Sequence, residues 1–178
     1  MFILDEREEG MRIIGPPSAT KETVLNRLTV RAGVHPRFRA EMFDPLWAAA
    51  LKYGVDPVGV IAQSGKETGW GNFGGNVRPE FYNTAGIKIR WQNLYPGVTD
   101  DDKPLAHSMF ASWAVGAEAH VQHLRAYAGW PVTDQLIVDP RYVFVTQHRC
   151  ENFEELGGKW APALSYGPEL VAIARSLQ

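Results

Sequence analysis

Apolar residues recur at the three- and four-residue spacing of a helix in several parts of the chain. Val24, Leu25 and Leu28 predict a short helix over residues 20 to about 31. A longer helix is predicted after Ser112, where one face carries the apolar stripe Ala117, Val121, Leu124 and Ala128. The pattern therefore favours a mainly helical chain.

Asp-Pro pairs predict the starts of further helices. In Asp44-Pro45 and Asp56-Pro57 the Asp is expected to cap free backbone amides, and the Pro to occupy the first turn. The helix predicted over residues 57 to about 68 has few charges and small residues on several sides, which indicates a buried central helix. Asp139-Pro140 and Tyr166-Gly167-Pro168 introduce the last helical segments.

An irregular segment separates the two groups of helices. Residues 72–104 are rich in Gly, Asn, Asp and Pro, and Ile87, Ile89 and Trp91 alternate with polar positions. This alternation predicts a short, irregular β-hairpin. Helices on both sides of a small β insertion suggest two lobes with a groove between them, which suits a polymeric ligand.

Length and composition fit one domain with little net charge. A chain of 178 residues that is 45% hydrophobic is long enough for one sizeable core and short for two. We expect residues 1–19 to form a tail or lead-in and residues 20–178 to form a single α+β domain. Because the formal net charge is only -2, no large basic field is available for nucleic acid.

The beginning of the chain does not resemble a secretory signal. It turns acidic after three apolar positions, whereas a signal peptide has a basic start and a longer apolar run. No stretch approaches the roughly 20 apolar residues that cross a bilayer, so membrane insertion is not expected. We expect either a protein that stays in the cytoplasm until another route releases it, or part of a larger exported protein.

Glu67 is the strongest candidate for chemistry. It lies at the end of the predicted buried helix, on the same face as Gln63 and Ser64, with Trp70 nearby. Burial and the negative end of the helix dipole both raise the pKa of a carboxyl, which favours a proton donor near neutral pH. Glycoside hydrolysis needs such a donor. A glutamate paired with Lys or Arg is the alternative, and these features alone leave both open.

Histidine and cysteine do not predict a metal site. His120 and His123 are one helical turn apart, but no nearby acidic or Cys ligand completes a shell, so we expect packing or surface histidines. Cys150 is the single cysteine and has no ligand-spaced neighbours, so we expect a structural or incidental thiol.

Three segments in series resemble the glucosaminidase-type domain of glycoside hydrolase family 73: Glu67-Thr68-Gly69-Trp70-Gly71, Asn83-Thr84-Ala85-Gly86-Ile87-Lys88 and Phe110-Ala111-Ser112-Trp113. The similarity runs from about Pro45 to the end of the chain. It implies a lysozyme-like fold and an endo-β-N-acetylglucosaminidase that cleaves peptidoglycan glycan strands. It also implies Glu67 as the general acid, no cofactor, and, by our expectation, a monomer.

The resemblance also implies substrate-binding residues. Asn83 would bind an acetamido or hydroxyl group and Gly86 would let the backbone approach the sugar, although both residues equally suit a turn. His107 is expected to border the groove. Among the aromatic residues, Trp70, Trp160 and Tyr166 are candidates for stacking on sugar rings, although each alone is more often a core residue. Tyr166 is preferred, since the family's closing motif has a cleft tyrosine.

The chain departs from the family pattern at the second carboxylate. Many members carry a glutamate on the hairpin, and none stands at a matching place here. The nearest candidates are Asp100, Asp101 and Asp102 in an acidic loop, of which we select Asp102, although such a loop is usually a solvated turn. An inverting route through this Asp remains open, as does a route assisted by the substrate's own acetamido group. The second route needs only Glu67 and an orienting Tyr or Asn, for which Tyr166 is the catalytic candidate.

Three functions are compatible with these features. The first is a peptidoglycan glucosaminidase, such as a phage endolysin or an autolysin catalytic domain. The second is a muramidase or lytic transglycosylase on the same scaffold, which the missing hairpin glutamate keeps open. The third is a noncatalytic wall-binding module, against which the intact Glu67 motif argues.

Overall fold

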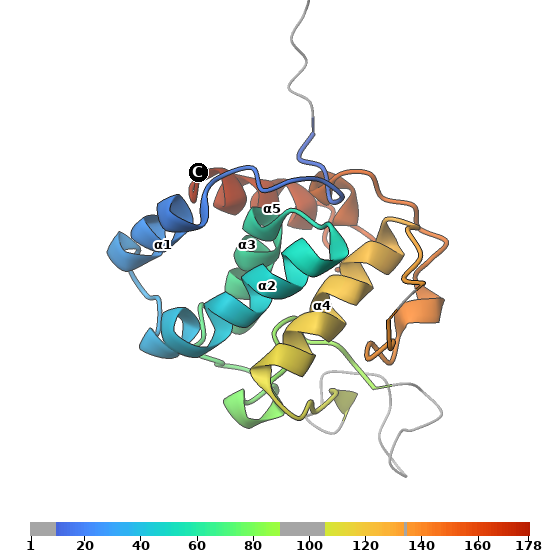
Figure 1. Ribbon diagram of the computed structural model, residues 1–178, viewed down its shortest axis with the longest axis horizontal. Coiled ribbons are helices and arrows are strands. Elements are labelled where there is room, and N and C mark those ends of the chain that lie inside the picture. The colour runs from blue at the N-terminus through green and yellow to red at the C-terminus, as the bar shows by residue number, and fades with distance from the viewer. Residues whose placement is uncertain (1–9, 90–105, 134) are drawn as a thin grey trace, which may run out of the picture.

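The computed structural model describes residues 10–89, 106–133 and 135–178 (Figure 1). This part of the chain contains five α-helices: α1 (Lys21–Val30), α2 (Phe43–Tyr53), α3 (Pro57–Thr68), α4 (Trp113–Tyr127) and α5 (Tyr166–Arg175). Four short helical segments join them: η1 (Phe38–Met42), η2 (Pro79–Phe81), η5 (Tyr142–Phe144) and η6 (Phe153–Leu156). The prediction of a mainly helical chain is confirmed.

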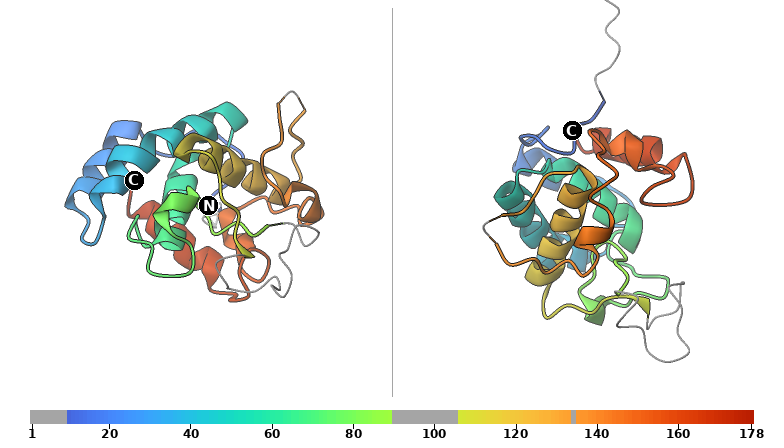
Figure 2. Two further views of the ribbon diagram at one scale, coloured as in Figure 1. Left: turned by 90° about the horizontal axis from the view of Figure 1, so that it is seen from below. Right: turned by 90° about the vertical axis from the view of Figure 1, so that its right-hand side faces the viewer.

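The helices pack around α3. It contacts α2 on one side and α5 on another, and α2 in turn packs against α4 (Figure 1, Figure 2). Ten of the twelve residues of α3 are buried, so the predicted central helix is confirmed. Gly59 explains one close contact, because a Cβ there would lie 2.2 Å from ring atoms of Phe153. None of the described helices is both long and apolar enough to span a membrane.

Local capping signals fix three helix starts. Thr20, Asp56 and Ser112 each accept a hydrogen bond from a backbone amide in the first turn of the helix that follows. The predicted cap at Asp44 is wrong: α2 begins at Phe43 and has no side-chain cap. The π-helical η1 runs directly into α2, so its carbonyls accept the amides that a cap would serve. Asp44 instead pairs with Lys21 at 2.8 Å.

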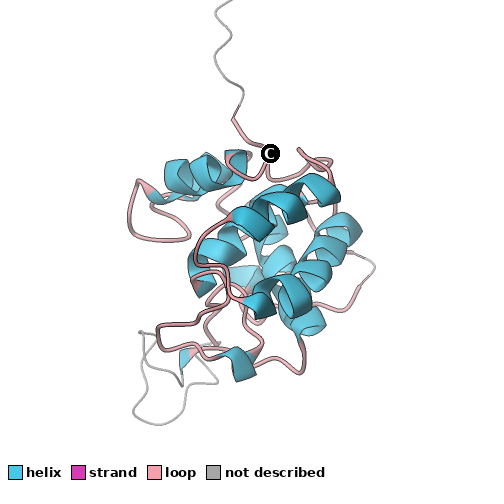
Figure 3. Ribbon diagram, turned by 90° about the vertical axis from the view of Figure 1, so that its left-hand side faces the viewer, coloured by secondary structure: helices cyan, strands magenta, loops and turns pink. Residues whose placement is uncertain are grey.

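The predicted β-hairpin is also largely wrong within the described residues, which contain no strand (Figure 3). A single antiparallel bridge joins Lys88 and His107. Asn83 ends the pairing on one side of this bridge, since its side chain accepts from the amide of Ile87 and donates to the carbonyl of Ser108, two groups that would otherwise bond to each other. Residues 90–105, the rest of the predicted hairpin, lie outside the described residues. Asp139-Pro140 leads only to the short η5.

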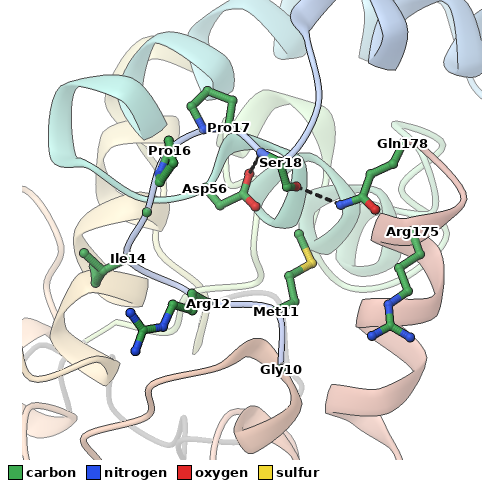
Figure 4. A pocket seen from close by; sticks show the side chains of 11 residues that line it. Gly10, Met11, Arg12, Ile14, Pro16, Pro17, Ser18, Asp56, Arg175 and Gln178 are labelled. Carbon is green, nitrogen blue, oxygen red and sulfur yellow. Dashed lines mark hydrogen bonds between the residues drawn. The ribbon is translucent and has the colours of Figure 1, made fainter. Parts of the chain in front are cut away.

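Residues 10–19 pack on the helices. Ile13 is wholly buried and its carbonyl accepts from the amide of Asp56 at 2.9 Å. A cavity of about 460 Å³ lies between this segment and the end of α5 (Figure 4). At its edge Ser18 donates its amide to Asp56 and accepts from Gln178. The described part of the lead-in is therefore tied to both α3 and the C-terminus.

Asp56 is expected to stabilise the domain through these contacts. One carboxylate oxygen accepts from the amides of Val58 and Ser18, so the Asp56→Ala variant leaves two amides without their acceptor. We expect a loss of about 1–2 kcal/mol, measured by urea unfolding. The Asp56→Asn variant keeps an acceptor oxygen and should lose less. Equal stability of Asp56→Ala and the parental protein would contradict this role.

Candidate active site

The C-terminal end of α3 opens into a cleft of about 710 Å³. One wall is formed by the turn after α3, another by the segment around Gly86, and a third by the segment before α5. The lining residues are Glu67, Thr68, Gly69, Phe73, Gly74, Gly75, Asn76, Val77, Ala85, Gly86, Lys88, His107, Trp160, Ala161 and Pro162. Among these described residues Glu67 is the only carboxylic acid.

The two carboxyl oxygens of Glu67 have different surroundings. Oε1 accepts two hydrogen bonds, from the Tyr166 hydroxyl at 2.5 Å and from the Trp160 indole nitrogen at 3.1 Å. Oε2 lies on the side of Gly86, where an added Cβ would be 3.8 Å away. Because Oε1 is engaged by two donors, Oε2 is the oxygen that can carry a proton toward a ligand in the cleft.

Burial raises the pKa of Glu67 above its usual value. The hydrogen bonds from Tyr166 and Trp160 and the charge of Lys66 act in the opposite direction but do not cancel it. Lys66 is not a direct partner, since its ammonium group binds Glu169 at 2.7 Å. The carboxyl therefore keeps its proton to higher pH than an exposed glutamate, as the sequence predicts.

Tyr166 lies behind Glu67 rather than along the cleft wall. Its side chain is buried, and its hydroxyl accepts from Gln63 at 3.0 Å while donating to Glu67. Burial and the adjacent Glu67 carboxyl raise the pKa of Tyr166, so the phenol stays neutral and remains a donor. This placement favours orientation of Glu67 over stacking on a sugar.

Trp160 does line the cleft. Its indole nitrogen is bound to Glu67, and its ring packs edge-on against His123 at 5.0 Å and tilted against Tyr127 at 5.3 Å. These contacts fix the ring at the cleft wall. Its role in binding a sugar stays a prediction.

Asn83 has no free hydrogen-bonding group for a sugar. It is fully buried, and besides its two donated bonds its side-chain oxygen accepts from the amides of Ala85 and Ile87. The structure therefore places Asn83 in the turn role that the sequence left open. Gly86 and His107 both line the cleft, and Gly86 has a φ of +64°, a conformation that strains other residues.

Trp70 is not among the described residues that line the cleft, and its contact with a sugar stays a prediction. It has a positive φ of 57°, which directs the ring toward Phe38 at 5.3 Å and under the guanidinium of Arg31 at 4.5 Å. Gly65 makes room for it, since a Cβ there would be 2.4 Å from the indole. Asp102 lies outside the described residues.

The sequence does not by itself assign Gln63 and His120 to this site. Both are fully buried, and Nε2 of His120 lies 3.0 Å from Oε1 of Gln63. The only available signal is the position of Gln63 one helical turn before Glu67 on a helix with few charged residues. His123 pairs separately with Asp139 at 2.7 Å, and the described residues contain no cluster of three metal-ligand side chains.

Residues 44–178 match the glucosaminidase family model, described as mannosyl-glycoprotein endo-beta-N-acetylglucosaminidase. An uncharacterized protein of Borreliella burgdorferi is 33% identical over 128 residues, which cover 72% of this chain and 57% of that protein. The chain thus spans little more than half the length of this relative. The catalytic domain of the autolysin Auto from Listeria monocytogenes is 18% identical, with a TM-score of 0.46 over 90% of this chain and 96% of that domain.

The family match includes the cleft, the Glu67 carboxyl and the two side chains that donate to it. The match begins at the second residue of α2, so it leaves out Phe43 and the residues before that helix. Over most of its length, from the helix that supports α3 to the last residue, the chain belongs to the glucosaminidase family and forms a glycoside hydrolase domain.

Proposed function

We propose that this domain is an endo-β-N-acetylglucosaminidase that cleaves the glycan strands of peptidoglycan. The observation that supports it best is the buried carboxyl of Glu67, which faces a polymer-sized cleft and has a raised pKa. A glycosidase needs such a group to protonate the departing oxygen. Membership of the glucosaminidase family indicates cleavage beside N-acetylglucosamine.

The two carboxyl oxygens of Glu67 have different roles in the proposed reaction. The proton on Oε2 passes to the glycosidic oxygen as the bond to the anomeric carbon breaks. The carboxylate left behind is stabilised at Oε1 by the Tyr166 hydroxyl and the Trp160 indole, which gain strength when their acceptor becomes charged. In the route assisted by the 2-acetamido group the same carboxylate then takes a proton from the incoming water, which restores the acid. In the inverting route a second carboxylate takes that proton, and Glu67 regains its own from solvent.

We keep Asp102 as the candidate base of an inverting reaction. In the alternative route the 2-acetamido group of the sugar attacks the anomeric carbon, and no second carboxylate is needed. The product configuration separates the two. Proton NMR of a fresh digest shows the α-anomer first if Asp102 activates water, and the β-anomer first if the acetamido group reacts.

The bond that is cut is the decisive test of the proposed function. Purified cell walls are digested, the products are reduced with borohydride, and the new sugar ends are identified by mass spectrometry. We expect N-acetylglucosamine at the reduced ends. N-acetylmuramic acid there would identify a muramidase, and 1,6-anhydro ends would identify a lytic transglycosylase. Binding to walls without new ends would identify a noncatalytic module.

We further propose that the domain acts at the bacterial cell wall, as the catalytic part of an autolysin or of a phage endolysin. A cleft that is open to solvent and lined by Gly, Asn and aromatic side chains suits a long glycan strand. Turbidity loss of intact cells after external addition of the protein tests this role.

A further inference from the structure

A continuous chain of buried polar groups runs from Glu67 away from the cleft. The Tyr166 hydroxyl donates to Glu67 at 2.5 Å, and the amide nitrogen of Gln63 donates to that hydroxyl at 3.0 Å. The amide oxygen of Gln63 lies 3.0 Å from Nε2 of His120, and Nδ1 of His120 lies 3.2 Å from the Thr84 hydroxyl. The chain therefore links α5, α3, α4 and the segment after η2.

The direction of the hydrogen bond from Gln63 to Tyr166 sets the order of donors in this chain. Tyr166 has one hydroxyl hydrogen, and because its oxygen accepts from Gln63, that hydrogen is directed to Glu67. Gln63 then presents its oxygen to His120, so the imidazole must carry its hydrogen on Nε2. Nδ1 is left to accept from Thr84. Every donor in the chain points toward Glu67.

The opposite order would remove a donor from the site. If the Gln63 amide turned over, its oxygen would accept the Tyr166 hydrogen, and Oε1 of Glu67 would keep only the Trp160 bond. His120 prevents this turn as long as its Nε2 carries a hydrogen. Burial lowers the pKa of His120 to about 3, so the ring stays neutral over the range in which Glu67 titrates.

We propose that Gln63 and His120 are positioning residues of this site: they hold the Tyr166 hydroxyl as a donor to Oε1 of Glu67 and thereby leave Oε2 to carry the acid proton. The catalytic consequence rests on the proposed function, but the positioning itself does not. Other titratable groups near the carboxyl among the described residues are Lys66 on α3, and Lys88 and His107 across the cleft.

The test is a carbon-13 NMR titration of the Glu67 carboxyl in the free protein, with its signal assigned from the Glu67→Gln variant. The Gln63→Met and His120→Leu variants should raise the pKa of Glu67 by about one pH unit, in the same direction as Tyr166→Phe, because each removes the donor or what holds it. Neither should add to the effect of Tyr166→Phe. The His120→Gln variant offers an amide donor where Nε2 stood and should restore the parental pKa.

A second readout follows catalysis. On soluble glycan fragments Gln63→Met and His120→Leu should lower kcat about tenfold, with little change in KM, and should move the alkaline limb of the pH profile upward. Effects that add to Tyr166→Phe, or an unchanged Glu67 titration in Gln63→Met, would overturn the proposal. If a leucine at position 120 prevents folding, nitrogen-15 NMR of the parental protein decides instead: a hydrogen on Nδ1 of His120 overturns it.

These outcomes are separable from failure of the proposed function. A parental protein that releases no new sugar ends from cell walls would refute the glucosaminidase proposal, while the Glu67 titration in the variants would still measure the positioning. Conversely, an active enzyme whose Glu67 pKa ignores Gln63 and His120 refutes only the positioning.

Discussion

The Glu67→Gln variant is expected to cleave peptidoglycan about 10²–10⁴-fold more slowly than the parental protein, with its fold intact. Glutamine has the same shape and can still accept the hydrogen bonds of Tyr166 and Trp160 through its amide oxygen. It has no acidic proton to give to the departing oxygen. The rate of release of reducing sugar ends from purified walls measures the effect, and thermal unfolding verifies the fold.

The role of Glu67 as an acid also predicts how activity depends on pH. The acid must be protonated, so parental activity falls as pH rises through the raised pKa of Glu67. The alkaline limb should therefore lie above the pH at which an exposed glutamate titrates, and the residual activity of Glu67→Gln should lack this limb.

Glu169 offers a matched control close to Glu67 but outside the cleft. Glu169 is exposed on α5 and binds Lys66, the neighbour of Glu67, so Glu169→Gln makes the same chemical change outside the cleft. Its cleavage rate should equal that of the parental protein. A Glu67→Gln variant that cleaves at the rate of Glu169→Gln would remove Glu67 from the mechanism.

The parts of the fold that the sequence predicts are those decided by neighbouring residues. Asp56-Pro57 and Ser112 predict helix starts correctly, because a capping side chain binds backbone amides only two or three residues away. Asp44-Pro45 carries the same local signal and fails, because the π-helical segment before it continues into α2. The end of the pairing beside the Lys88–His107 bridge likewise depends on Asn83, whose side chain binds the amide of Ile87 and the carbonyl of Ser108.

In the site, too, features set by neighbouring residues are predicted from the sequence, and features that depend on distant residues are not. Glu67 is found from its position on a buried helix, and its raised pKa follows from that burial. The partners of its carboxyl, Trp160 and Tyr166, are more than ninety residues away, so only the resemblance to the family pointed to them. Trp70 is next in sequence but turns away through its left-handed backbone, which no spacing rule predicts.

The Gly116→Ala variant is expected to lose about 3 kcal/mol of stability, which corresponds to a fall in Tm of about 10 °C. A Cβ at Gly116 would lie 1.7 Å from the backbone oxygen of Tyr82 and 2.9 Å from its carbonyl carbon. The usual gain of about 1 kcal/mol from alanine in a helix cannot offset this overlap, because the backbone of a neighbouring segment must move. Circular dichroism during heating measures the change.

Gly15→Ala is the matched control, because no atom lies within 4 Å of a Cβ at that position. It should leave the Tm within about 2 °C of the parental value. Equal Tm values for Gly116→Ala and Gly15→Ala would contradict this prediction. They would mean that the segment after η2 can move away from α4 with little loss of folding free energy.

The Gly116→Ala substitution should also reduce the rate of peptidoglycan cleavage at temperatures where the variant is folded. The segment after Tyr82 carries Gly86 to the cleft wall opposite Glu67, and Oγ1 of Thr84 in this segment lies 3.4 Å from the carbonyl oxygen of Gly116. Displacing this segment by about 1 Å should lower kcat/KM at least about tenfold, since catalysis depends steeply on such distances. Asp56→Ala, which weakens the fold far from the cleft, should keep its rate, so a stability loss alone cannot produce this result.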